Sequence, residues 1–146
     1  MLLTSPDFDT NKFIPTKFGY RHGNVSPTLR IDSAPTVADC LAILLFDPDA
    51  PNGNFTHWIT WNIPPETIEV SSSNIPGSAI SGLNDMGSSG YMGPAPPSGV
   101  HHYHFVVYAL KTKLGIPQTS QRTDFDRSIA GVVLEKTELI GLYSEN

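Results

Sequence analysis

Two aspartates and four histidines are the side chains of this 146-residue chain best suited to binding or acid–base chemistry. Asp47 and Asp49 stand in the motif DPDAP (47–51), directly after an apolar run. His57 follows shortly afterwards, and three more histidines lie within residues 101–104. Carboxylates beside imidazoles are typical of sites that orient, protonate or bind a small charged ligand.

The charge map gives these histidines a particular role. No Lys or Arg occurs between Arg30 and Lys111, although seven Asp and Glu residues do. Only an imidazole can therefore supply positive charge in this stretch, and a nearby ionised carboxylate favours the charged imidazole. We expect His57 or His101 to become that cation. Backbone N–H groups of the glycine-containing turn 90–95 are expected to supply further donors to an anion.

Strand periodicity predicts which histidines act together. In an extended run side chains alternate between faces, so His101 should share one face with Tyr103 and Phe105. His102 and His104 should lie on the opposite face. These histidines therefore form two half-sites rather than one cluster.

The elements that must position these residues are mostly strands. Thirteen prolines and twelve glycines interrupt the chain too often for long helices, which favours a mainly β fold. The same alternation places His57 with Ile59 and Trp61, and Trp58 on the other face. We expect strands over 37–46, 56–63, 100–110 and 132–143, a short helix over about 124–130 capped by Thr123, and a long ordered loop over 71–99.

This element order predicts a two-sheet antiparallel β-sandwich with Greek-key connections, one or two short helices and a long Gly/Pro-rich loop. The length predicts a single domain over residues 1–146. A net charge of −5 argues against nucleic acid and anionic membranes as partners. The start of the chain lacks the pattern of a signal peptide and no apolar run is long enough for a membrane span, so we expect a soluble cytoplasmic protein.

Several motifs resemble the phosphatidylethanolamine-binding protein family, in particular its short prokaryotic Raf kinase inhibitor-like branch. They include NVSP (24–27), DPDAP (47–51) with the following His57-Trp58, YMGPAPP (91–97), GVHHYHF (99–105) with Tyr108-Ala-Leu110, and LIGLY (139–143), and they occur in order over nearly the whole chain.

The resemblance implies an anion-accepting pocket at one end of a β-sandwich and no cofactor. It also implies a cis bond at Ala50–Pro51 and, as in many members of the branch, a homodimer. Carried over position by position, the ligand-binding residues are Asp47, Asp49, His57, Gly93, Ala95, Pro96, His101 and Tyr103.

Two positions depart from the family pattern. His102 stands where the family usually has an arginine between the histidine and the tyrosine, which removes a fixed positive charge near the expected pocket. Ala95 stands where relatives often carry Gly or Cys.

The function that follows is binding of a small anion: phosphate, phosphoethanolamine or a carboxylate, more tightly below about pH 6.5. The carboxylates would orient the imidazoles and meet an ammonium head group. Relatives inhibit kinases and some peptidases, so the resemblance also implies regulation of such a partner. The expectation is a non-enzyme, without catalytic or metal-binding residues.

Other interpretations of the same residues stay open. The aspartates can serve the turn itself, and the histidines can be half-buried strand residues. A metal-dependent or Asp/His hydrolase using the same pocket is the alternative function, with His102 and His104 as a zinc-type pair. The segment GSSGY (87–91) lacks the glycine of a nucleophile elbow, and Cys40 lies in an expected core strand, so a nucleophile is not evident.

Overall fold

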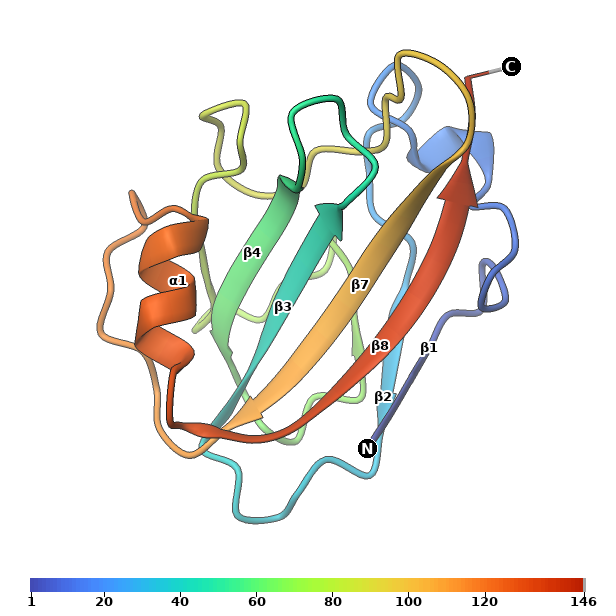
Figure 1. Ribbon diagram of the computed structural model, residues 1–146. Coiled ribbons are helices and arrows are strands. Elements are labelled where there is room, and N and C mark those ends of the chain that lie inside the picture. The colour runs from blue at the N-terminus through green and yellow to red at the C-terminus, as the bar shows by residue number, and fades with distance from the viewer. Residues whose placement is uncertain (146) are drawn as a thin grey trace.

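The computed structural model describes residues 1–145 and shows two antiparallel sheets with one α-helix (Figure 1). The larger sheet has the order β6-β4-β3-β7-β8, and the smaller sheet has the order β1-β2-β5. The elements are β1 Leu2–Thr4, the 3-10 turn η1 Thr16–Phe18, β2 Leu29–Asp32, β3 Cys40–Asp47, β4 Phe55–Ile63, β5 Glu69–Val70, β6 Ile80–Ser81, β7 His101–Leu110, α1 Arg122–Ile129 and β8 Val133–Tyr143.

Strand β3 occupies the centre of the larger sheet and is buried on both faces from Cys40 to Leu45. The uninterrupted apolar run in its sequence predicts this placement. The strand begins at Cys40 rather than at Val37 as expected. Val37 is 75% exposed, and the N–H of Ala38 donates to the carbonyl of Pro35 in a turn before the strand.

The smaller sheet covers one face of the larger one, with β1 and β2 behind it in Figure 1. Its inward residues Leu29, Ile31 and Val70 belong to one apolar cluster with Ile43 of β3 and Val107 of β7. Burial of such side chains contributes roughly 1.5–3 kcal/mol each. This shared layer holds the two sheets face to face.

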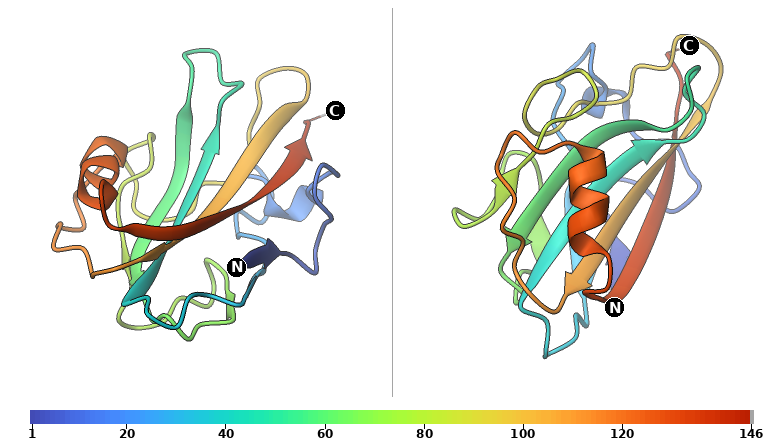
Figure 2. Two further views of the ribbon diagram at one scale, coloured as in Figure 1. Left: turned by 60° about the horizontal axis from the view of Figure 1, so that its bottom comes forward. Right: turned by 60° about the vertical axis from the view of Figure 1, so that its left-hand side comes forward.

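The opposite face of the larger sheet is covered by α1, which lies across β3 and β4 in the right-hand view of Figure 2. Phe125 packs against Trp61 and Tyr108. The helix begins two residues earlier than expected, so Thr123 lies inside it. Gln121 is the N-cap, and its backbone N–H donates to the carboxylate of Asp124 three residues later.

The predicted fold class is confirmed: the chain is mainly β, with two antiparallel sheets and one short helix. The sandwich with Greek-key connections and the single domain over 1–146 remain predictions, and residue 146 lies outside the described residues. Among residues 1–145, none of the helices combines the length and apolar character needed to cross a bilayer.

The layer between the sheets can be tested with a matched pair of leucines in the smaller sheet. Leu29→Ala should lower the free energy of unfolding by about 2–5 kcal/mol, because Leu29 is fully buried between the sheets. Leu2→Ala should change it by about 0.5 kcal/mol or less, because 57% of Leu2 is exposed. Urea unfolding of both variants measures the difference, and equal losses would contradict the packing described.

Candidate functional site

The end of β3 places Asp47 beside the first residue of β7. Asp47 is only 3% exposed, and its Oδ2 lies 2.6 Å from Nδ1 of His101. Its Oδ1 accepts a hydrogen bond of 2.8 Å from the backbone N–H of Asp49. Both carboxylate oxygens therefore have donors, as a buried charge requires. His101 donates through Nδ1, so its Nε2 is left for a ligand.

His57 reaches the same place because β4 contains a β-bulge. Leu45 pairs with Trp58 and Phe46 pairs with Thr56, so His57 is an extra residue without a partner in β3. The bulge turns His57 toward Tyr103, and the ring centroids lie 5.4 Å apart, edge to face. The expectation that His57 shares a face with Ile59 and Trp61 is wrong.

His57 lies on the same face of the sheet as Trp58. Ile59 and Trp61 lie on the opposite face, in the apolar cluster beneath α1. The physical reason is the added residue, which shifts the alternation by one position. Simple periodicity holds in the stretch 101–105 of β7, where His101, Tyr103 and Phe105 are buried and His102 and His104 are more exposed.

The protonation of His57 follows from its surroundings. Its Nδ1–H donates to the backbone carbonyl of Met92 at 2.7 Å, because a carbonyl can only accept. Burial lowers the pKa of His57 below its ordinary value, although this hydrogen bond and the charge of Asp47 act in the opposite direction. In the free protein the ring is therefore neutral near pH 7, and Nε2 carries a lone pair.

Tyr103 forms a buried surface between these groups. Burial, together with the negative charge of Asp47, raises the pKa of the Tyr103 hydroxyl well above its ordinary value. The hydroxyl therefore keeps its proton at every physiological pH. It interacts with the carboxylate of Asp47 and with the backbone of Ala95, so it joins the β7 strand to the loop above it.

These side chains line one pocket of about 180 Å³ at the end of the larger sheet, where β3 ends and β7 begins at the top of Figure 1. Six of the eight expected residues line it: Asp47, His57, Ala95, Pro96, His101 and Tyr103. Sequence reasoning missed the apolar lining residues, namely Ala50, Pro51, Phe55, Met86, Met92 and Pro97. Phe55 is two residues before His57 in the strand, so alternation could have indicated that it lines the pocket. Nothing in the sequence indicates that Met86 does.

Asp49 and Gly93 support the pocket without lining it. Both the backbone N–H and Nδ1 of His102 contact Oδ2 of Asp49, at 2.8 and 2.7 Å. These contacts hold the 48–54 loop against β7, and the hydrogen bond from the His102 side chain is the main reason why the pKa of Asp49 is lowered. The histidine at the family's arginine position thus contacts the loop on the outer side of β7.

Gly93 is a site of close backbone packing. A Cβ atom there would collide with the carbonyl oxygen of Phe18 and the backbone nitrogen of Tyr20. Its N–H donates to Oδ1 of Asn24 at 2.8 Å. The glycine therefore lets residues 18–24 support the loop that carries Ala95 and Pro96.

The backbone donors expected in the turn 90–95 are mostly engaged elsewhere. The N–H of Gly90 donates to the carbonyl of Gly82, and that of Met92 donates to the carbonyl of His57. The N–H of Gly93 is held by Asn24, and Pro94 has no N–H. The imidazoles therefore matter more for an anion than the turn does. The structure has no cis peptide bond in the described residues, so the cis Ala50–Pro51 bond expected from the family is not present.

Known proteins resemble this chain in sequence and in fold. Residues 4–144 match the family model described as phosphatidylethanolamine-binding protein. The chain belongs to this family. It is 42% identical to a UPF0098 protein of Pyrococcus horikoshii, covering 97% of this chain and 76% of that protein. It is 38% identical to a UPF0098 protein of Methanothermobacter thermautotrophicus, covering 98% of both.

Two crystal structures share the fold. A phosphatidylethanolamine-binding protein homolog from Chlamydia trachomatis, CT736, has a TM-score of 0.93 at 30% identity, covering 99% of this chain and 97% of that one. YbcL of E. coli, described as a member of the mammalian family, has a TM-score of 0.93 at 28% identity, covering 99% and 98%. The predicted family membership is confirmed over nearly the whole chain.

The support given by residues 18–24 can be tested at Gly93. Gly93→Ala should lower the free energy of unfolding by about 1–3 kcal/mol, because the added methyl meets backbone atoms that cannot rotate away. Gly115→Ala is the matched control, since a Cβ at Gly115 meets nothing within 4 Å. Thermal unfolding of the two variants gives the comparison. A Gly93→Ala protein as stable as the control would show that the loops are not in close contact.

Proposed function

We propose that this protein binds a small anion bearing a phosphate or carboxylate group in the pocket between His57 and His101. The observation that carries the proposal is the pair of imidazoles, each held through Nδ1 by a protein acceptor. Each ring therefore keeps Nε2 for a ligand in a defined orientation. The titratable residues proposed to contact or polarise the ligand are Asp47, His57, His101 and Tyr103, with Ala95 and Pro96 as pocket walls.

The protonation of the pocket selects the form of the ligand. Neutral His57 offers an acceptor at Nε2, whereas His101, with Nδ1 held by Asp47, offers a donor at Nε2 when it is in its charged form. A phosphate that still carries one proton can satisfy both, donating to His57 and accepting from His101. A ligand without a proton requires His57 to take one up, against the effect of burial on its pKa. For such a ligand, binding and proton uptake are therefore linked.

The rest of the pocket is apolar and small. Phe55, Met86, Met92 and the three prolines surround the imidazoles, and the cavity volume is about 180 Å³. Apolar walls exclude water and strengthen the few charge-assisted hydrogen bonds. The space suits an inorganic anion or one with a short substituent, such as phosphoethanolamine.

We propose a binding role rather than catalysis. The alternative of an Asp/His hydrolase draws on the Asp47–His101 pair, but the pocket lining among residues 1–145 holds no Ser, Thr, Cys or Lys nucleophile. In the same described residues no group of three His, Cys, Asp or Glu side chains is placed to hold a metal ion. The pocket thus supports binding better than hydrolysis.

The wider role that we propose is regulation of a protein partner, a kinase or a peptidase, through the rim of this pocket. The support is family membership, together with the exposed Met86 at the pocket. A homodimer and a cytoplasmic location remain part of the proposal. A relative from Mycobacterium tuberculosis, 33% identical, carries the word lipoprotein in its name, so location can differ within the family.

Isothermal titration calorimetry with inorganic phosphate tests the binding proposal. The affinity for sulfate should rise up to about tenfold for each pH unit between pH 8 and pH 7, because His57 must take up a proton, whereas phosphate already carries a proton in this range and its affinity should change much less. Sulfate, which holds no proton near neutral pH, should bind more weakly than phosphate at pH 7, because His57 resists protonation. A sulfate affinity that is independent of pH, or equal affinities for the two anions at pH 7, would contradict the account of His57.

Matched histidine variants locate the effect. His101→Gln should weaken phosphate binding about tenfold or more, because it removes a charge-assisted hydrogen bond. His104→Gln is the control, because His104 stacks on Phe46 on the other face of the sheet and does not line the pocket. Equal losses in both variants would place the anion elsewhere.

A further inference from the structure

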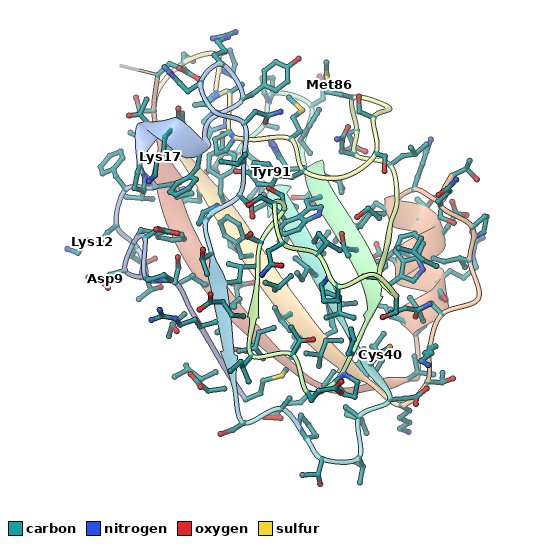
Figure 3. All side chains as sticks on the ribbon, turned by 180° about the vertical axis from the view of Figure 1, so that it is seen from behind. Asp9, Lys12, Lys17, Cys40, Met86 and Tyr91 are labelled. Atoms are coloured by element: carbon teal, nitrogen blue, oxygen red, sulfur yellow. The ribbon has the colours of Figure 1, made fainter. Side chains whose placement is uncertain are left out.

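A second hollow adjoins the proposed anion pocket. Its cavity volume is about 200 Å³, and Met86 and Met92 line both spaces. The remaining walls come from the loop that carries Tyr20 and Asn24, from the 84–89 loop and from Tyr91. Figure 3 shows Met86 and Tyr91 on the same long loop, at the end of the molecule where the pocket lies. The two hollows are thus neighbours with a shared methionine wall.

The second hollow is polar, yet it carries no charge. No Asp, Glu, Lys, Arg or His lines it. Its polar lining consists of side-chain amides and hydroxyls from Asn24, Asn84, Ser88, Ser89, Tyr20 and Tyr91. This composition contrasts with the Asp–His pair and mostly apolar walls of the anion pocket.

Three of these side chains have hydrogen-bonding capacity to spare. Asn24 uses Oδ1 to accept from Gly93, which leaves its NH₂ group available. The hydroxyls of Tyr20 and Ser88 make no hydrogen bond within residues 1–145. Asn84, in contrast, is mostly engaged, since its NH₂ group donates to the carbonyl of Gly90 and its Oδ1 accepts from two backbone N–H groups.

These groups define what the hollow can accept. A second phosphate would find no cation, and an acyl chain would cover the amide and the hydroxyls without replacing their bonds to water. Hydroxyl groups can both donate to and accept from Asn24, Ser88 and Tyr20, while the aromatic ring of Tyr20 and the side chain of Met86 cover the C–H faces of a polyol. An uncharged ligand segment rich in hydroxyls is the best match.

We propose that the protein binds a phosphorylated polyol, with the phosphate between His57 and His101 and the hydroxyl-bearing carbons in the second hollow. This inference rests on the proposed anion site and adds the class of the substituent. Met86 is the exposed one of the two methionines that line both spaces, at 58% exposure, and it is unbranched, so it can move to let one ligand span both. Tyr20, Asn24 and Ser88 then act as specificity-determining residues.

A ligand pair of equal carbon length tests the proposal by calorimetry at pH 7. Sorbitol 6-phosphate should bind at least about fivefold more tightly than hexyl phosphate, because its hydroxyls form hydrogen bonds that the alkyl chain cannot. In the double variant Tyr20→Phe/Ser88→Ala the two ligands should bind about equally, while the affinity for inorganic phosphate stays unchanged. Tyr108→Phe, on the α1 face of the sheet, is the control and should keep the preference.

The outcomes separate this inference from the anion site. Equal binding of the two ligands, or tighter binding of hexyl phosphate, overturns the polyol assignment while phosphate binding still supports the site. A preference that survives in the double variant overturns the placement in the second hollow. If inorganic phosphate itself does not bind, the proposed function fails, and the polyol assignment fails with it.

Discussion

Asp47 carries a negative charge into the interior at the end of β3, and the site depends on how this charge is satisfied. An isolated buried carboxylate is strongly unfavourable, so its two oxygens must have donors. His101 supplies one from β7, and the backbone of Asp49 supplies the other from the loop that follows the strand. One carboxylate therefore fixes the register of a loop and the orientation of an imidazole together.

The β-bulge at His57 completes the arrangement from the other side of β3. Without the extra residue, regular alternation cannot place both His57 and Trp58 toward the smaller sheet. The imidazole of His57 then donates to the carbonyl of Met92, and the N–H of Met92 donates to the carbonyl of His57. The long loop is thus attached to the sheet at the point where its methionines and prolines close over the imidazoles.

The resulting pocket combines a neutral histidine with one that faces a carboxylate, inside apolar walls. Such a pocket responds to protons, because a ligand must bring one or His57 must gain one. The clamp between His102 and Asp49 lies outside the pocket and positions the loop rather than the ligand. An arginine at position 102 would place a fixed positive charge on the outer surface of β7. His102 instead acts there mainly through its two hydrogen bonds to Asp49.

Much of the fold and part of the site follow from the sequence. Apolar runs and turn residues predict β3, β4, β7 and β8 to within a few residues, and alternation in β7 separates His101 from His102. A bulge has no sequence signal of its own, so the face of His57 could not be predicted. The roles of Asp49 and Gly93 depend on loops meeting across long sequence distances, which spacing does not determine. The lining by Met86 likewise arises only when the long loop folds back.

The tautomers and protonation of the two imidazoles test the central claim most directly. Long-range ¹H–¹⁵N NMR at pH 7 should show His57 neutral with its proton on Nδ1 in the free protein, and a proton shared with Nε2 when phosphate is added. A His57 that is already doubly protonated in the free protein, or one whose nitrogen shifts do not change as phosphate saturates the site, would contradict the account.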